Sequence, residues 1–414
     1  MAVFAQSVGN VSPGVESAQA WLRLAAAVVI STIGSVGMWS VVVALPAIQA
    51  DFGIARADAS LPYTMAMVGF ALGGVVIGRL ADRFGIVPPL VIGTLALGGG
   101  YLGSALAANV WQLALLHLFI GFGTSAGFAP LIADISHWFV RRRGIAVAVC
   151  ASGNYLGGTV WPPVVQYFIA ADGWRLTQVG IGLFCMLAMG PFIRVMRQHK
   201  TSNGADLSLG AEHGASGTLG LSPGALQLLL CIAGLTCCVA MSMPQVHIVA
   251  YCSDLGYGVA RGAEMLSLMM GFGLVSRIAS GFIADWVGGL RTLLLGSALQ
   301  ALALFLYLLS DGLTPLYVIS ALFGLFQGGI VPMYAVLVRE YFPPQEAGTR
   351  LGLVIMATIV GMALGGWMSG AIFDLTGSYW QAFANGLLWN LVNISIVVFL
   401  LQRRTPRAVA GYVS

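Results

Sequence analysis

The sequence predicts an all-α membrane protein with twelve transmembrane helices arranged in two related six-helix bundles. Three observations predict this fold: too little charge for a water-exposed surface, apolar runs long enough to span a bilayer, and motifs that occur once in each half. Charged residues make up 8% of the 414 residues and hydrophobic types 58%, whereas a soluble domain carries about 25% charge. This composition excludes a soluble enzyme.

Apolar runs recur along the whole chain, and each is long enough to cross about 30 Å of hydrocarbon as a helix. They must be helical, because lipid offers no hydrogen-bond partners to backbone N–H and C=O groups. The first half is expected to span the bilayer at residues 22–45, 61–81, 89–107, 111–133, 145–168 and 179–196. The second half is expected to span it at residues 226–251, 263–284, 293–309, 316–337, 351–372 and 383–401.

Basic residues are distributed unequally over the loops between these spans. Fifteen Lys and Arg residues fall on the side of the N-terminus, and three, Arg56, Arg175 and Arg261, fall on the other. Loops rich in Lys and Arg stay in the cytoplasm, so both termini are predicted to be cytoplasmic. The expected domains are a tail at 1–21, a six-helix bundle at 22–197, a Gly- and Ser-rich linker at 198–223, a second bundle at 224–402 and a tail at 403–414.

Two short motifs each occur twice, about half the chain apart. GRLADRFG at residues 78–85 returns as GFIADWVG at residues 281–288. Adjacent glycines repeat in the fifth and eleventh spans, as Gly157 and Gly158 and then as Gly365 and Gly366. Such internal duplication is typical of secondary transporters, which bind their substrate between the two repeats.

The pattern Gly78-x-x-x-Asp82-Arg83-x-Gly85 resembles the loop motif of the major facilitator superfamily, and the span count and the repeat agree with that resemblance. We expect these residues to act in a gate. Gly78 would let a neighbouring helix approach closely, Asp82 would pair with a cation or a helix N-terminus, and Gly85 would permit a tight turn. The alternative is that the motif only sets topology and forms a loop turn.

Further gating residues follow from the motif and its second copy. Asp134, near the end of the fourth span, is the predicted partner of Arg83. The second copy supplies Gly281 and Asp285. Trp286 stands where the first copy has its arginine, so a charge relay should be weaker on that side.

A further group of motifs resembles the monocarboxylate porter and oxalate–formate antiporter branch of the superfamily. The motifs are His137-Trp138-Phe139-x-x-Arg142-Arg143-Gly144, Ser152-Gly153-x-x-x-Gly157, Asp172-Gly173-Trp174-Arg175, His247-x-x-x-Tyr251-x-x-Asp254-x-Gly256 and Asp374-x-Thr376-Gly377-Ser378-Tyr379. The resemblance implies transport of a small organic anion by proton symport or by exchange. The eleventh span has no lysine, where dicarboxylate antiporters of this branch place a second cation.

Arg277 is the predicted substrate-binding cation and a candidate for proton coupling. It lies inside the eighth span, where a charge costs about 2.5–3.5 kcal/mol and therefore faces a cavity or a partner. Eight residues separate it from Asp285, which places it about 12 Å from the helix end. A guanidinium binds carboxylates in a bidentate manner, and a single cation favours a monoanion. The alternatives are an arginine that snorkels to the headgroups and a structural ion pair.

Four other residues complete the predicted site. Asp254 is a candidate for proton coupling with Arg277, or an ordinary loop aspartate. His247, seven residues earlier, would titrate or donate to the substrate, or be a structural histidine. Asn154 and Tyr334 are expected to line the cavity and contact the substrate, although polar side chains also hold membrane helices together.

The sequence gives no sign of a cofactor. It contains no P-loop, no metal-ligand cluster and no nucleophile–base motif, so we expect no ATP, no metal, no nucleic-acid partner and no enzymatic activity. The expected partners are the small organic anion, protons and the lipid bilayer, and the expected state is a monomer. Arginine is used almost exclusively over lysine, which favours a GC-rich bacterial genome and hence an inner membrane. The alternative functions are efflux of amphipathic compounds and a sensor with a transporter fold.

Overall fold

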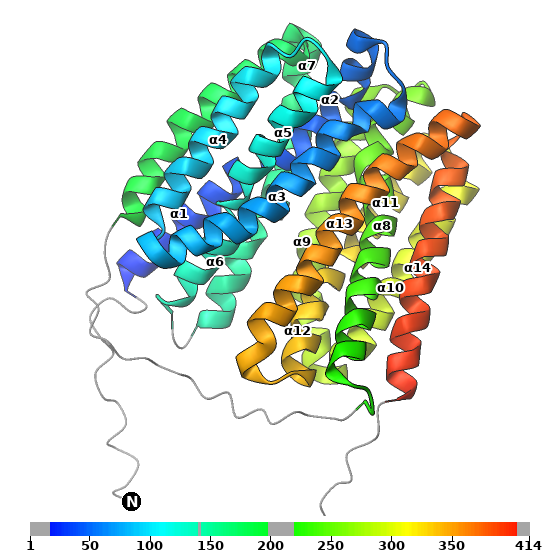
Figure 1. The fold of residues 1–414 in the computed structure, drawn as a ribbon. Helices are drawn as coiled ribbons and strands as arrows, with labels where there is room; N and C mark the ends of the chain where they lie inside the picture. Colours follow the sequence, from blue (N-terminus) through cyan, green and yellow to red (C-terminus); the bar gives the residue numbers. More distant parts are fainter. Residues whose placement is uncertain (1–16, 140–141, 198–218, 404–414) are drawn as a thin grey trace, which may run out of the picture.

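The computed structural model describes residues 17–139, 142–197 and 219–403, which form fourteen helices and no strand (Figure 1). The helices of the first half are α1 (Ala18–Gly34), α2 (Val36–Phe52), α3 (Arg56–Phe84), α4 (Val87–Ala105), α5 (Val110–Ser125), α6 (Ala129–Ser136) and α7 (Arg143–Met196). Those of the second half are α8 (Pro223–Asp254), α9 (Val259–Val287), α10 (Gly289–Leu309), α11 (Leu313–Gln327), α12 (Ile330–Tyr341), α13 (Pro344–Thr376) and α14 (Tyr379–Gln402).

Eleven helical stretches of the described residues are long and apolar enough to cross a membrane. Three of them consist of two consecutive helices: α1 with α2, α5 with α6, and α11 with α12. The predicted linker and both tails lie almost entirely outside the described residues.

The longest helix, α7, corrects one expectation. It consists of two helices that meet at a sharp break, since 54 residues of unbroken helix would measure about 80 Å, more than twice the hydrocarbon thickness. The helix is interrupted at Gly173, which has a φ of 79° and a ψ of 163°. The spans predicted at 145–168 and 179–196 are therefore joined by a glycine break and not by a loop.

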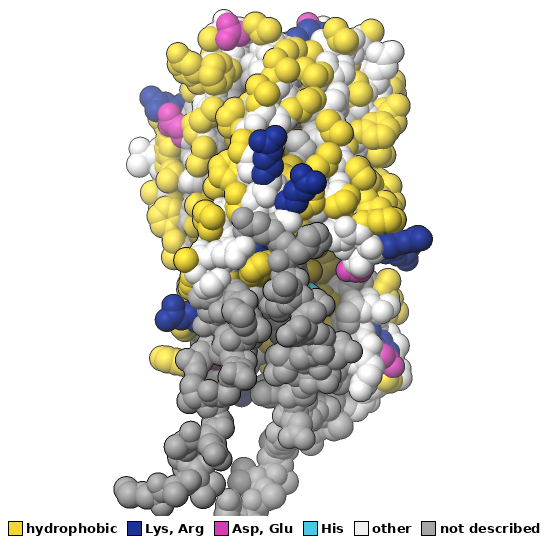
Figure 2. All heavy atoms as spheres, turned by 90° about the vertical axis from the view of Figure 1, so that its left-hand side faces the viewer, with side chains coloured by type: hydrophobic (Ala, Val, Ile, Leu, Met, Phe, Trp, Pro, Cys, Tyr) yellow, Lys and Arg dark blue, Asp and Glu magenta, His cyan; other side chains and the backbone are white. Residues whose placement is uncertain are grey.

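The two halves, α1–α7 and α8–α14, lie side by side (Figure 1). Contacts between them follow mainly two helix pairs, α3 with α13 and α7 with α9, and α2 adds contacts with α8 and α9. We call this surface the seam. We call the end of the bundle where α1 begins and α14 ends the terminal end, and the opposite end, where α3 begins and α13 ends, the far end. On the upper part of the face in Figure 2, where described residues are visible, apolar side chains predominate, as a lipid-facing surface requires.

Glycines let helices touch at the level of the backbone, and they do so in the same way in each half. A Cβ added at Gly69 or Gly121 would overlap with a backbone carbonyl of the other helix in the α3–α5 pair. The same holds in the second half for Gly324, which meets the backbone of α9. Small residues that allow such an approach are the usual basis of helix association in lipid.

The duplicated glycine pairs also occupy equivalent places. A side chain at Gly157 would overlap with the hydroxyl of Ser35, and one at Gly365 with the hydroxyl of Ser242, each at the first span of its own half. Their neighbours face the seam: Gly158 lies against Met270 of the second half, and Gly366 against Tyr63 of the first. The glycine pairs that repeat in the sequence therefore make equivalent helix contacts in the two halves.

Replacing Gly121 by alanine should destabilise the folded protein by about 2–3 kcal/mol. The new methyl group would overlap with the backbone carbonyl of Ala66, which cannot rotate away as a flexible side chain can. The midpoint of thermal unfolding in detergent measures the effect. Gly74→Ala in α3 is the matched control, because a Cβ there meets nothing within 4 Å. An equal midpoint for the two variants would contradict the packing described above.

Candidate functional site

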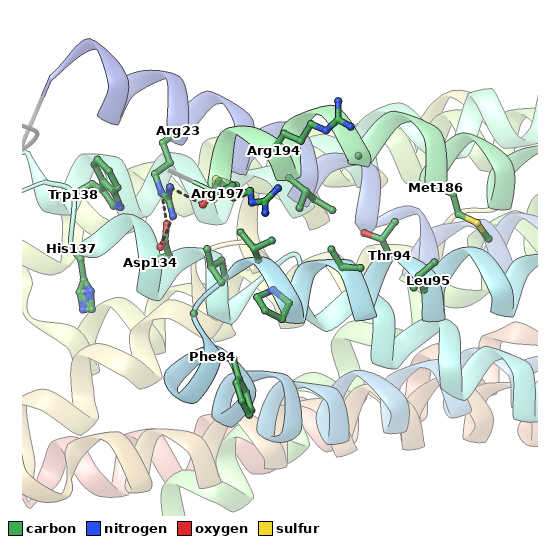
Figure 3. A pocket seen from close by; sticks show the side chains of 18 residues that line it. Arg23, Phe84, Thr94, Leu95, Asp134, His137, Trp138, Met186, Arg194 and Arg197 are labelled. Carbon is green, nitrogen blue, oxygen red and sulfur yellow. Dashed lines mark hydrogen bonds and ion pairs between the residues drawn. The ribbon is translucent and has the colours of Figure 1, made fainter. Parts of the chain in front are cut away.

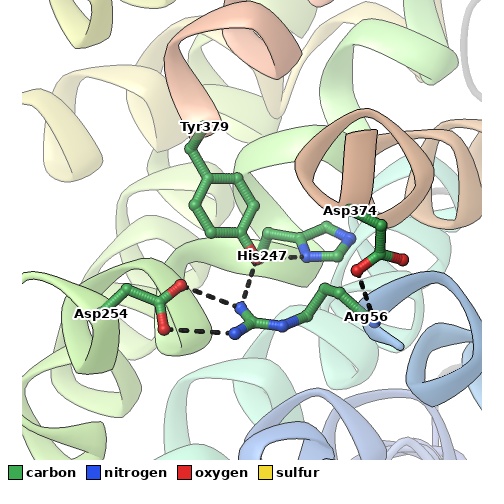
Figure 4. A network of polar contacts seen from close by, with 5 residues as sticks. All are labelled: Arg56, His247, Asp254, Asp374 and Tyr379. Atoms are coloured by element: carbon green, nitrogen blue, oxygen red, sulfur yellow. Dashed lines mark hydrogen bonds and ion pairs between the residues drawn. The ribbon is translucent and has the colours of Figure 1, made fainter. Parts of the chain in front are cut away.

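An ion pair closes the seam at the far end, between the first residue of α3 and the last residue of α8 (Figure 4). Two guanidinium nitrogens of Arg56 donate to the two carboxylate oxygens of Asp254, both at 3.1 Å. Arg56 also donates to the hydroxyl of Tyr379 at 2.6 Å. The Arg56 side chain is only 7% exposed, whereas that of Asp254 is 34% exposed.

A second carboxylate adds backbone contacts at the same place. Asp374 accepts the backbone N–H of Arg56 at 2.8 Å and that of Ala57 at 2.7 Å. The first N–H groups of a helix have no acceptor within that helix, and a negative charge is favourable beside them. The carboxylate of one half thus caps a helix of the other half. We call the cluster of Arg56, His247, Asp254, Asp374 and Tyr379 the far-end latch.

His247 belongs to this latch. Its Nε2 lies 2.7 Å from the carbonyl oxygen of Gly366, and its Nδ1 lies 2.9 Å from the hydroxyl of Tyr379. Because a carbonyl only accepts, Nε2 carries the hydrogen and Nδ1 accepts from Tyr379. A chain of hydrogen bonds therefore runs from the Arg56 guanidinium through the Tyr379 hydroxyl to the buried imidazole.

The structure separates Asp254 from Arg277, contrary to the expected shared site. Asp254 ends α8 at the far end, where it pairs with Arg56. Arg277 lies 18 residues beyond the start of α9 at Val259, about 27 Å further along the bundle. The structure therefore does not bring these two residues into one site, contrary to that expectation.

Arg277 lies in the seam between α9 and α7. Its guanidinium stacks over the ring of Tyr155, 4.6 Å from the ring centre, and donates a long hydrogen bond of 3.4 Å to the carbonyl of Ala151. Its Nε is buried and has no hydrogen-bond partner in the described protein. Among the described residues no carboxylate pairs with it. The seam thus holds a partly buried cation that has no carboxylate counter-ion within the described ranges.

Other polar atoms in the same region also lack partners within the described part of the chain. They are Trp39 Nε1, Tyr63 Oη, Asn154 Oδ1 and both amide atoms of Gln327, all buried. Their positions are linked through the seam glycines: Gly158 adjoins Trp39, Gly366 adjoins Tyr63, and Gly273 lies between Tyr155 and Gln327. Most buried polar groups in proteins are hydrogen-bonded. These exceptions are spread along the seam and offer hydrogen-bond partners to a polar ligand that passes through it.

The remaining predicted substrate residues are placed differently from one another. Asn154 borders a small hollow in the first half, together with Met38 and Phe128. The next residue in the chain is Tyr155, whose ring contacts the Arg277 guanidinium. Tyr334 is fully buried inside the second half and donates to Asn393 of α14 at 3.2 Å. A role for Tyr334 in lining the seam does not fit this placement.

The predicted partner of Asp134 is corrected. Its carboxylate accepts from Nε and Nη2 of Arg23, at 2.7 and 2.8 Å, and not from Arg83. The guanidinium of Arg83 lies instead over the ring of its neighbour Phe84, at 5.3 Å. Because both oxygens of the Asp134 carboxylate accept from Arg23, its charge is already neutralised without Arg83.

The two copies of the loop motif both lie at the terminal end. Gly85 has a φ of 77°, so the predicted turn is confirmed. Gly78 and Gly281 have open space where a Cβ would stand, so neither is in close contact with another helix. Asp82 and Asp285 are exposed and form no ion pair with any residue that the structure describes. The far end is latched in this structure, whereas the motif residues at the terminal end are not engaged.

Comparison with known proteins identifies the family. A model of the Major Facilitator Superfamily matches residues 27–316 and 291–411. The chain is 28% identical to monocarboxylate transporter 13 of Bos taurus, over 81% of this chain and 79% of that protein. It is also 28% identical to the MFS-type transporter opdF of Penicillium oxalicum, over 86% and 83%.

The fold agrees with a solved transporter. A bacterial homolog of the human lysosomal transporter Spinster, in an inward-facing and occupied conformation, superimposes with a TM-score of 0.65. The match covers 92% of this chain and 94% of that one, at 16% identity. The family match, the relatives and the fold lead to one conclusion: this chain is a multi-pass membrane protein that belongs to the Major Facilitator Superfamily.

Proposed function

We propose that this transporter moves a small organic anion, a monocarboxylate, through the seam by alternating access. The observation that carries the proposal is Arg277, a partly buried cation between the halves with no carboxylate partner among the described residues. A charge at such depth is costly unless it meets an opposite charge. A carboxylate substrate would supply that charge and would accept from the Nε that has no acceptor in the described protein.

The substrate class follows from charge and from the surrounding side chains. One cation neutralises one anionic group, and the other seam arginine with an unpaired Nε, Arg56, already has its charge paired with Asp254. Trp39, Tyr155 and Met270 add apolar surface beside the polar atoms, which suits a small carbon skeleton. The names of the relatives in animals, monocarboxylate transporters, agree with this class.

In this proposal α7 crosses the bilayer twice, so the chain makes twelve crossings and the terminal end is cytoplasmic. The far-end latch then shuts the outer side while the inner side is disengaged, and transport requires the latch to break and re-form. Energy comes from a proton gradient or from exchange with a second anion. The alternative of efflux of amphipathic cations is opposed by the charge of Arg277.

Uptake into proteoliposomes tests the proposal. Labelled monocarboxylates of two to six carbons should enter at least tenfold faster than dicarboxylates of equal length. An inward proton gradient accelerates uptake if transport is symport, and preloading with unlabelled carboxylate accelerates it if transport is exchange. Cationic dyes should not be transported. Dye transport without any carboxylate flux would overturn the proposal.

A further inference from the structure

A cleft lies outside the seam, at the terminal end of the first half (Figure 3). It has a volume of about 790 Å³ and is bordered by α1, by the start of α4, by α6 and by the last turns of α7. Neither the substrate path nor the far-end latch reaches it. Its lining combines the arginines of α1 and of the end of α7 with apolar side chains, among them Phe84 and Leu95 across the cleft (Figure 3).

The packing of α4 against α7 explains where the cleft stops. The two helices touch at Gly98 and Gly182, where an added Cβ would lie 3.1 Å and 2.9 Å from the opposite backbone carbonyl. The side chain of Met186 closes the space next to this contact. Nearer the terminal end the described residues of the two helices meet through side chains such as Thr94 and Met189, and the cleft opens beside them.

The wall at the terminal end is rigidly built. Arg23 forms its bidentate pair with Asp134, donates to the carbonyl of Met196 at 3.0 Å, and lies 4.7 Å from the centre of the Trp138 ring. Its guanidinium thus donates to groups of the protein itself, and the Asp134 carboxylate neutralises its charge. The pair fixes the end of α7 against α6 and holds the cleft in shape.

Two further arginines bring uncompensated charge to the same cleft. Arg194 and Arg197 stand on the last turn of α7, line the cleft and are exposed. Neither forms an ion pair with a carboxylate in the described parts of the chain. The wall that Arg23 and Asp134 build is neutral, so this end of the cleft has a net positive charge that is available to a ligand.

The opposite wall is apolar and accessible. Phe84, Val91 and Leu95 line the cleft and expose 56%, 41% and 58% of their surface. Leu95 lies eight residues into α4 from Val87, about 12 Å from the helix end. A ligand that fills the cleft would place a negative group at the helix ends and a hydrocarbon chain along α4. This combination describes a lipid.

We propose that this cleft binds one anionic phospholipid, with its phosphate held by Arg194 and Arg197 and an acyl chain along Phe84, Val91 and Leu95. Basic pockets between membrane helices at the level of the headgroups are suited to such lipids. The bound lipid would fasten α4 to the last turn of α7. The site is independent of the substrate proposed for the seam, because the two share no residue.

Native mass spectrometry of the full-length protein with added phosphatidylglycerol tests the site. Wild type should retain one phosphatidylglycerol. The double variant Arg194→Gln/Arg197→Gln should bind it about 30-fold more weakly, the factor expected when two basic groups near a headgroup are lost. Binding of phosphatidylcholine should not change. The double variant Arg291→Gln/Arg403→Gln is the control, because it removes two exposed arginines at the same end but outside the cleft.

Two further measurements distinguish a site that binds a whole lipid from a site that binds only a phosphate group. Leu95→Gln leaves the arginines intact and should still weaken phosphatidylglycerol binding, because it makes the apolar wall polar. Glycerol phosphate and inorganic phosphate should not compete at concentrations that saturate the lipid. Equal loss of lipid in the two double variants, or full competition by inorganic phosphate, would overturn the proposal. All three variants change exposed side chains, and size-exclusion chromatography checks that they fold.

Discussion

Replacing Arg277 by glutamine should lower the uptake of a monocarboxylate by about 100-fold or more. A hydrogen bond to a charged group contributes about 1.5–3 kcal/mol, and a bidentate guanidinium–carboxylate pair makes two of them. Loss of about 3 kcal/mol already corresponds to a factor of more than 100. Initial rates of uptake into proteoliposomes, at equal amounts of reconstituted protein, measure the effect.

The same substitution should hardly affect folding. Arg277 donates one long hydrogen bond within the described protein and pairs with no described carboxylate, so its removal costs little native structure. Arg277→Lys should retain part of the activity, because the charge remains but the bidentate fork is lost. Arg291→Gln, at an exposed cation outside the seam, is the matched control. Wild-type uptake by Arg277→Gln would show that this arginine does not hold the substrate.

Asp254→Ala should open the far-end latch more than Arg56→Ala does. Without Asp254, the closed state still buries the guanidinium of Arg56, which is only 7% exposed, and a buried charge that has lost its partner is strongly unfavourable. Without Arg56, the carboxylate of Asp254 is 34% exposed and can be hydrated. We expect Asp254→Ala to cost the closed state about 2 kcal/mol more than Arg56→Ala, or roughly 30-fold in its population.

Distances between spin labels at Ala55 and Leu375 measure this effect, because both are exposed residues that adjoin the latch on opposite halves. The double variant Arg56→Ala/Asp254→Ala should behave like Arg56→Ala and not like the sum of the single variants, since it removes the stranded cation. Uptake should fall in all three variants, because the transport cycle requires the latch to form. Equal opening by the two single variants would mean that desolvation of Arg56 does not decide the closed state.

The sequence by itself determined the architecture. The exclusion of backbone polar groups from lipid acts on every residue of a span, so low charge and apolar runs sufficed to predict the helices. The duplicated motifs predicted the two halves. Turn glycines such as Gly85 could be predicted in the same way, because a tight turn is a local requirement. Arg277 was detectable because any charge within a span is conspicuous.

Only the tertiary structure decided which polar residues meet. Asp254 finds Arg56 at a separation of 198 residues, and Asp134 finds Arg23 at a separation of 111. Neither pair leaves a signal in the sequence of one chain. The motif at the end of α13 drew attention to Asp374 and Tyr379, but nothing in it indicated that they contact Arg56.

The physical reason lies in the solvent around the helices. In water an amphipathic stripe indicates which face of a helix is buried. In this chain most helices are apolar on every side, so the sequence does not indicate how each is rotated. Tyr334 is an exception, because its helix α12 is amphipathic: Tyr334 lies on the buried face with Met333 and Leu337 and donates to Asn393 inside the second half. The lipid environment thus determines that these helices form, and packing between them determines what their few polar side chains contact.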